Sequence, residues 1–425
     1  MRVLMFGWEF PPHITGGLGT ACFGLTRSLA RMHTDVLFVV PRAFGDEDTS
    51  MVKLVNASDV EVDLEKSEYS EFWKRIQYMS VASDIIPYVG PVEYSHTHVK
   101  KLKKEFHSNS IFSHRYTFSG SYGKDLMYEV SRYALIASGI AASNNFDIIH
   151  AHDWLTYPAG IAAKQVSGKP LVIHVHATEF DRSGEHVNQR VFDIEREGMM
   201  QADRVITVSN LTRNIVIERY GINPDKVFTV YNGADAFQAP AIERIEKPFP
   251  EKVVTFLGRI TFQKGPDYFV EAAKKVLEKD ENVRFVMAGS GDMLPRIVRM
   301  VSKHRMGHKF HFTGFLKGND VDKMFSYSDV YVMPSVSEPF GISPLEAMRS
   351  SVPVVISRQS GVAEVLRHAL KVDFWDVDAM ADSIYGLLNY PALSRMFSRF
   401  GRNEVEDLKW DNAAASVLSV YQHLV

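Results

Sequence analysis

The sequence predicts an α/β protein made of two doubly wound parallel sheets that face each other across a cleft. Short, continuous apolar runs alternate with helical patterns, as expected for parallel strands buried on both faces. The alternation stops in residues 232–251, a segment with three prolines, and restarts at residue 252. The 425 residues are also enough for two domains of ordinary size.

The first half of the chain contains six predicted strands. They cover residues 2–7, 35–40, 146–151, 170–176, 204–209 and 226–231. A helix is expected over residues 19–32, where apolar residues recur at helical spacing. Residues 43–130 are polar with scattered aromatic side chains. We expect them to be an elaboration of a first Rossmann-like domain that spans residues 1–240.

The second half repeats this rhythm. A strand over residues 252–258 precedes a helix over 266–279, which opens with Pro266, a residue suited to the first helical position. These elements begin a second Rossmann-like domain over residues 250–400. Residues 401–425 are expected to form a helix that packs back on the first domain. The remaining predicted strands cover residues 283–289, 309–314, 329–334 and 352–357.

Composition excludes several classes of protein. The chain is 45% hydrophobic and 23% charged, which is ordinary for a globular protein, and its formal net charge of −3 gives no reason to expect nucleic-acid binding. Cys22 is the single cysteine, so no intramolecular disulfide can form. No apolar run reaches the roughly 18 residues of a spanning helix. We therefore expect a cytoplasmic protein without integral membrane association.

Ligands of doubly wound sheets bind beyond the carboxyl ends of the strands. Gly16 and Gly17 follow the first strand, and glycines there let a phosphate approach the backbone at a helix start. An ordinary tight turn is the alternative. No acidic residue follows the second strand, where Pro41 and Arg42 stand, which counts against a dinucleotide dehydrogenase.

Two histidine pairs end neighbouring strands of the first domain. His150 with His152, and His174 with His176, each share one face of a strand, a spacing that zinc can use. Ligand spacing without cysteine is a loose signal, so we expect no metal. For His150 and His174 we expect hydrogen-bonded positions in the core.

Asp153 and Trp154 follow the strand at 146–151. An aromatic face can pack on the C–H groups of a sugar while a carboxylate accepts protons from its hydroxyls. We therefore expect these two residues to bind the acceptor or the sugar.

Arg259 and Lys264 follow the first strand of the second domain. A guanidinium fork and an ammonium point charge together suit a diphosphate. A solvated surface pair is the alternative. We favour a site because the pair lies at the carboxyl end of a strand, beside a glycine and before a helix. Gly289, in the turn after the next strand, is a weaker candidate for contact with a nucleotide.

The stretch EPFGISPLE covers residues 338–346. If Ser343 or Pro344 starts a helix, Glu346 lies in its first turn, where it can accept from ribose hydroxyls. The backbone donors just before it would then point into the cleft, where a diphosphate fits. Glu338 precedes the turn and is expected to face the sugar. The expected donor-binding residues of this stretch are Gly341, Ile342, Ser343 and Glu346.

Taken together, these segments resemble the retaining nucleotide-sugar glycosyltransferases of the GT-B fold, family 4 in particular, and among them the glycogen and starch synthases. The second domain carries most of the likeness, in GRITFQKGPDYFVEAA and DVYVMPSVSEPFGISPLEAM. In the first domain GGLG, HAHDW and VYNGAD match as well. The resemblance covers nearly the whole chain except residues 43–130.

The resemblance implies a role for each candidate residue. Arg259 and Lys264 would neutralise the diphosphate, Glu346 would bind the ribose, and Glu338 would contact the transferred sugar. His176 would bind the donor sugar near the reacting centre. No metal or other cofactor is implied, because arginine and lysine supply the electrostatic stabilisation.

The resemblance also implies a hexosyl transfer from an ADP-, UDP- or GDP-sugar, with glucose and an α-1,4-glucan as the expected sugar and acceptor. Bacterial-type glycogen synthases have a lysine where this chain has Ile14, so the base of the donor stays open. The alternatives are another acceptor (a sucrose-type sugar, a lipid or a cell-wall glycan) and a non-transferase relative such as a nucleotide-sugar epimerase. The sequence does not indicate an oligomeric state.

Overall fold

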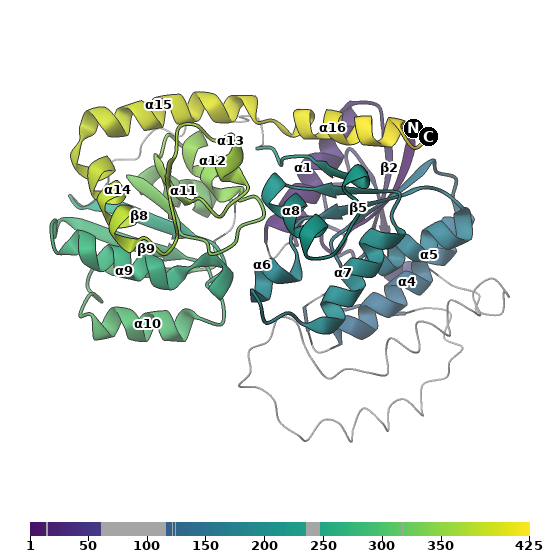
Figure 1. Ribbon diagram of the computed structural model, residues 1–425, viewed down its shortest axis with the longest axis horizontal. Helices are drawn as coiled ribbons and strands as arrows, with labels where there is room; N and C mark the ends of the chain where they lie inside the picture. Colours follow the sequence, from purple (N-terminus) through teal and green to yellow (C-terminus); the bar gives the residue numbers. More distant parts are fainter. Residues whose placement is uncertain (14–15, 61–115, 121, 124, 235–246, 317) are drawn as a thin grey trace, which may run out of the picture.

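A computed structural model describes residues 1–425 except 14–15, 61–115, 121, 124, 235–246 and 317. It contains two parallel sheets, one in each of two lobes, which confirms the predicted fold class (Figure 1). Most of the expected elaboration at 43–130, and part of the expected linker at 232–251, lie outside the described residues. Within the described residues, no helix combines the length and the apolar character needed to cross a bilayer.

The first sheet has seven strands, all paired in parallel, and its order reverses between β1 and β4. The predicted strands are all present, and one further edge strand, β3, joins them. In spatial order the strands are β3 (Lys53–Asn56), β2 (Asp35–Val40), β1 (Arg2–Phe6), β4 (Ile148–His152), β5 (Leu171–Val175), β6 (Arg204–Thr207) and β7 (Val227–Thr229).

Helices cover both faces of this sheet, because the strand side chains that point to either face are apolar. Leu4 and Phe6 pack under one group of helices, and Val3 and Met5 under another. On the first face lie α4 (Leu126–Ser143), α5 (Tyr157–Ser167), α7 (Gln189–Gln201) and α8 (Asn210–Glu218). On the second lie α1 (Gly17–Arg31) and α16 (Trp410–Gln422).

The second sheet repeats the design with six parallel strands, and its order reverses between β8 and β11. It includes one short strand, β13, that the sequence did not predict. In spatial order the strands are β10 (Phe310–Gly314), β9 (Val283–Ala288), β8 (Lys252–Leu257), β11 (Val330–Met333), β12 (Val354–Ser357) and β13 (Leu370–Val372).

Helices again cover both faces of the second sheet, and the last helix returns to the first lobe (Figure 1). One face carries α9 (Pro266–Leu277), α10 (Leu294–Lys303) and α14 (Val377–Asn389). The other carries α11 (Asn319–Tyr327), α12 (Ser343–Arg349), α13 (Val362–Val365) and α15 (Pro391–Asp407). After α15 the chain passes to the first lobe, where α16 packs beside α1.

Candidate active site

Several of the predicted site residues follow the strands at which each sheet reverses its order. Gly16 and Gly17 come after β1 and Asp153 comes directly after β4, while Arg259 follows β8 and Glu338 follows β11. These are the positions at which doubly wound sheets bind ligands.

Lys264 ends a short 3₁₀ helix, η5 (Phe262–Lys264), whose position depends on the next glycine. Gly265 has φ of 63°, and a Cβ there would lie 2.1 Å from the carbonyl oxygen of Pro334. Only glycine accepts both the conformation and the contact. The turn therefore fixes Lys264 beside the loop that leads to Glu338.

Lys264 and Glu338 form an ion pair with each other. Glu338 is only 6% exposed, and the Ser335 hydroxyl also donates to its carboxylate at 3.2 Å. The ammonium predicted to meet a diphosphate thus already has a carboxylate partner. A bound anion would share Lys264 with Glu338 or displace it.

Arg259 is exposed, and its guanidinium makes no ion pair within the described part of the chain. The turn beside it is shaped by close backbone packing. Gly289 has φ of 138°, and a Cβ on it would lie 1.9 Å from the carbonyl oxygen of Gly258. This backbone contact alone accounts for a glycine at position 289. The predicted contact of Gly289 with a nucleotide therefore stays a prediction.

The second glutamate lies where the sequence placed it. Helix α12 begins at Ser343 and Glu346 lies in its first turn, which confirms the predicted helix start. Gly341 has φ of 100°, a conformation that favours glycine. Gly341, Ile342 and Ser343 are half-buried at this turn, so part of their surface is exposed to a ligand. Their roles in donor binding stay predictions.

The glycine loop of the first domain faces open space. Gly16 precedes α1 in an extended conformation, with φ of −175°, and Gly17 is the first residue of the helix. A Cβ added to either would meet no atom within 4 Å. Neither glycine is therefore required by crowding or by a left-handed backbone, and a ligand can approach both.

The four histidines form two hydrogen-bonded pairs that stack on each other, on the face of the sheet that α1 and α16 cover. His150 Nε2 lies 3.2 Å from His174 Nδ1, and His152 Nδ1 lies 2.9 Å from His176 Nε2. His150 stacks on His152 and His174 on His176, each with ring centroids 4.3 Å apart. His150 also contacts the Tyr421 hydroxyl of α16. The buried, hydrogen-bonded positions expected for His150 and His174 are confirmed.

Burial keeps this histidine array neutral. It lowers the pKa of His150, His152 and His174 well below the ordinary value, and it lowers the pKa of half-buried His176 to about 3. Three of the rings have ring nitrogens within 4.8 Å of one another, a grouping that could hold a metal ion. Their nitrogens face each other in pairs, however, and this geometry favours hydrogen bonds over a shared ligand.

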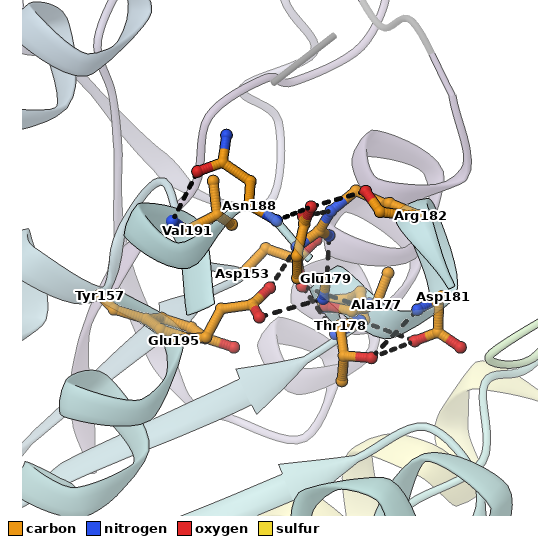
Figure 2. Close-up of polar contacts among 12 residues, drawn as sticks. Asp153, Tyr157, Ala177, Thr178, Glu179, Asp181, Arg182, Asn188, Val191 and Glu195 are labelled. Carbon is orange, nitrogen blue, oxygen red and sulfur yellow. Dashed lines mark hydrogen bonds and ion pairs between the residues drawn. The ribbon is translucent and has the colours of Figure 1, made fainter. Parts of the chain in front are cut away.

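The structure gives Asp153 a different contact from the one expected. Asp153 is 8% exposed, with φ of 60°, and its Oδ1 accepts the backbone N–H groups of His176 at 2.8 Å and Ala177 at 3.2 Å (Figure 2). Burial raises its pKa to about 6. Trp154 is 1% exposed in the core. The structure therefore does not support the predicted sugar contacts, since neither side chain offers a free face to a sugar.

A buried ionic network that involves Glu179, Arg182 and Glu195 was not predicted (Figure 2). Arg182 Nε donates to Glu179 at 3.1 Å, and the same guanidinium forms an ion pair with Glu195. Glu195 also accepts the backbone N–H of Glu179 at 3.0 Å. Burial raises the pKa of Glu195 to about 7. These contacts fix the short helix α6 (Glu179–Ser183) that follows His176.

Helix α6 brings the two domains together at the candidate site. Asp181 closes a capping box with Thr178, and its Oδ1 accepts the hydroxyl of Ser337, from the second domain, at 2.5 Å. Helix α6 also contacts η5, which carries Lys264. The segment after His176 therefore lies against the elements that carry Lys264 and Glu338. A cation and hydrogen-bonding groups of both domains therefore meet here, a combination that suits a polar, anionic ligand.

Two family profiles match the chain in sequence. One described as "Glycosyl transferases group 1" matches residues 237–404, and one described as "Glycosyltransferase Family 4" matches residues 96–236. The matched residues include Arg259, Lys264 and Glu338 in the first profile and His176 in the second.

Curated relatives match along most of their length. An uncharacterized glycosyltransferase of Methanocaldococcus jannaschii is 28% identical, over 99% of this chain and 98% of its own. The glycogen synthase of Mycobacterium tuberculosis is 25% identical, over 99% and 94%. The alpha-maltose-1-phosphate synthase of Mycolicibacterium smegmatis is 30% identical, over 65% and 78%.

Solved structures share the fold at low sequence identity. The sucrose-phosphate synthase from Thermosynechococcus elongatus superimposes with a TM-score of 0.74 at 18% identity, covering 100% of this chain and 98% of its own. An Anabaena protein crystallised with UDP and glucose superimposes with a TM-score of 0.69 at 15% identity, covering 100% of both chains.

Proposed function

The chain belongs to the family 4 glycosyltransferases of the GT-B fold and depends on a nucleotide-sugar donor, and from this premise we propose that it transfers glucose to an α-1,4-glucan with retention of the anomeric configuration. The observation that carries the proposal is the match to a glycogen synthase over 99% of this chain and 94% of that protein.

Charge stabilisation on the leaving group is the central chemical step of the proposal. Negative charge grows on the diphosphate as the bond to the sugar breaks, and fixed positive groups beside it lower the barrier. Arg259 and Lys264 would supply these groups, so the reaction needs no metal. The exposed side chain of Arg259 is free to reach a phosphate, and Lys264 can exchange its carboxylate partner for one.

The remaining residues would place the donor. Glu346 would accept from the ribose hydroxyls, and the backbone N–H groups of Gly16, Gly17 and residues 341–343 would approach the diphosphate and the sugar. Glu338 would contact the transferred glucose. The leaving phosphate would help to deprotonate the acceptor on the same face of the sugar, which retains the configuration. His176, neutral because its pKa lies far below 7, would hydrogen-bond the sugar.

A second candidate acceptor is a small sugar phosphate. The relative from Mycolicibacterium smegmatis is named for a phosphorylated disaccharide product, and it is the most similar of the three in identity, at 30%. A phosphorylated acceptor would still use the same donor site, so the two candidates differ only in what enters the cleft from the first domain.

A donor and acceptor screen tests the proposed function. Purified protein is incubated with ADP-, UDP- and GDP-glucose, each alone, with glycogen, and with glucose 1-phosphate, and released nucleoside diphosphate is measured with and without a chelator. We expect one donor to give release that depends on glycogen, resists the chelator and yields an α-linked product. Release that depends only on the sugar phosphate would favour the second candidate. A β-linked product or no release would contradict the proposal.

A further inference from the structure

Two consecutive residues at the end of β4 hold His176. Asp153 accepts its backbone N–H at 2.8 Å, and His152 Nδ1 lies 2.9 Å from its Nε2. His152 has no exposed surface, so it reaches a ligand only through His176. The other ring nitrogen of His176, Nδ1, makes no hydrogen bond with any described residue, and the ring is half-buried. That nitrogen is the one left for a ligand.

The bond between these two rings has a direction. Both imidazoles are neutral, so one ring donates and the other accepts. If His152 accepted at Nδ1, its own proton would sit on Nε2, which is buried without a partner. Buried N–H groups without an acceptor are rarer in proteins than unused acceptor lone pairs. His152 therefore donates from Nδ1, and His176 must carry its own proton on Nδ1.

The neighbouring pair of rings follows the same rule. His174 Nε2 is also buried without a partner, while its Nδ1 faces His150 Nε2 at 3.2 Å. If His174 donates from Nδ1, His150 accepts at Nε2 and has a proton on Nδ1, where it meets the Tyr421 hydroxyl. A single assignment, with the proton on Nδ1, thus satisfies all four rings.

We propose that His152 is a positioning residue that fixes His176 in the tautomer with its proton on Nδ1, so that His176 presents a hydrogen-bond donor to the sugar. The placement of a sugar against His176 rests on the proposed function, whereas the tautomer does not. A donor here selects for a lone pair on the ligand, such as that of a sugar hydroxyl oxygen, and the ring can turn only by breaking its bond to His152.

The tautomer is measured directly by nitrogen NMR on protein labelled with ¹⁵N-histidine, with the His176 signals assigned by their loss in His176→Asn. We expect His176 to show a protonated Nδ1 and an unprotonated Nε2 near pH 7. A proton on Nε2 would overturn the proposal. This readout needs no turnover, so it stands even if the proposed reaction is wrong.

Three variants test the positioning role. Asparagine carries a side-chain N–H donor that can replace the Nδ1–H of histidine, whereas leucine has none. His152→Leu should lower kcat by about 100-fold, the size expected when a reacting group is misplaced, with a smaller change in donor KM. His152→Asn should stay within about tenfold of the unmodified protein. His150→Leu removes an equally buried ring that is not bonded to His176 and should keep its kcat.

The outcomes separate positioning from simple stability. Equal losses of kcat in His150→Leu and His152→Leu, or an asparagine variant as slow as the leucine one, would overturn the positioning role. If His152→Leu does not fold, the tautomer of His176 in the asparagine variant decides, since the proposal requires it to be unchanged.

Discussion

The Lys264 ammonium meets the Glu338 carboxylate, and this ion pair defines the candidate site at the scale of single residues. A buried ion pair survives only when its geometry offsets the loss of hydration, and the Ser335 hydroxyl adds a hydrogen bond to Glu338. The ion pair thus holds the Lys264 ammonium in position and leaves neither charge without a partner. In the proposed function, the donor diphosphate would replace one anionic partner of Lys264 with another, which would keep the cost of charge reorganisation low.

Glu195 gives the protein a pH-dependent stability at the same scale. Its pKa of about 7 lies above the ordinary 4.5 because of burial, and the Arg182 guanidinium only partly offsets this. The folded protein therefore binds the proton more tightly than the unfolded chain. This contribution to stability is complete below about pH 4.5 and is lost as the pH rises through 7. A pKa shift of that size corresponds to about 3 kcal/mol in the free energy of unfolding.

We predict that Glu195→Gln has a shallower loss of stability between pH 5 and pH 8 than the unmodified protein, because glutamine does not titrate. Denaturant unfolding at a series of pH values measures this dependence of stability on pH. Asp153, with a pKa of about 6, contributes in the same direction and keeps part of the slope in both proteins. Glu197→Gln, an exposed change on the same helix, is the control. A variant whose slope equals that of the unmodified protein would show that Glu195 is ionised throughout.

Close packing of α1 against α16 joins the two ends of the chain at the scale of elements. A Cβ on Gly24 of α1 would lie 2.4 Å from the indole ring of Trp410, the first residue of α16. Trp410 is itself buried in the core under the first sheet, so its ring has little room to move. The glycine is therefore what allows α16 to lie against α1 and bring Tyr421 to the histidine array.

We predict that Gly24→Ala destabilises the protein by about 1–3 kcal/mol, the usual cost of overpacking a tight core. Gly386→Ala in α14 is the matched control, because the nearest atom to a Cβ there is 3.7 Å away. Alanine favours a helix by roughly 0.5–1 kcal/mol over glycine, so the control should be neutral or more stable. Thermal unfolding of both variants compares them, and similar melting temperatures would mean that α16 does not pack this closely.

The sequence predicted every central strand and the edge strands β7 and β10, but it missed the edge strands β3 and β13. Continuous apolar runs marked β1 and β8, whereas β3 and β13 are edge strands of four and three residues with little apolar signal. The neighbourhood of Lys264 and Glu338 followed from strand ends alone. The bond between His152 and His176 did not, because it depends on the register of β4 against β5, which no local pattern encodes. The burial of Trp154 was also missed, because it depends on how the segment after β4 packs in the core.

Contacts between the domains act at the scale of the whole molecule. Ser337 donates to Asp181 beside the site. Farther along the interface, Glu364 of α13 accepts the backbone N–H groups of Asn210 and Leu211 at 2.9 and 2.7 Å, where it caps α8. The two contacts tie the second domain to different helices of the first. In the proposed function a donor would touch residues of both domains, so the strength of these contacts would set how readily the site forms.

We predict that Ser337→Ala shifts the domains toward a more open arrangement, because it leaves the buried Asp181 oxygen without its partner across the interface. One hydrogen bond contributes about 1 kcal/mol, so the shift in population should be several-fold. Small-angle X-ray scattering without ligand should show a larger radius of gyration than in Ser302→Ala, an exposed control on α10. An unchanged radius with unchanged donor KM would mean that this contact does not control closure.

In the proposed function, Lys264 binds the diphosphate of a nucleotide sugar between the two domains. Calorimetric titration tests it directly, with the nucleoside diphosphate of the preferred donor and with the corresponding nucleoside, against the unmodified protein, Lys264→Ala and the exposed control Lys303→Ala. We predict that Lys264→Ala weakens diphosphate binding by at least about tenfold, as expected for a charge-assisted hydrogen bond, and leaves nucleoside binding unchanged. Equal affinities of all three proteins for the diphosphate would contradict it.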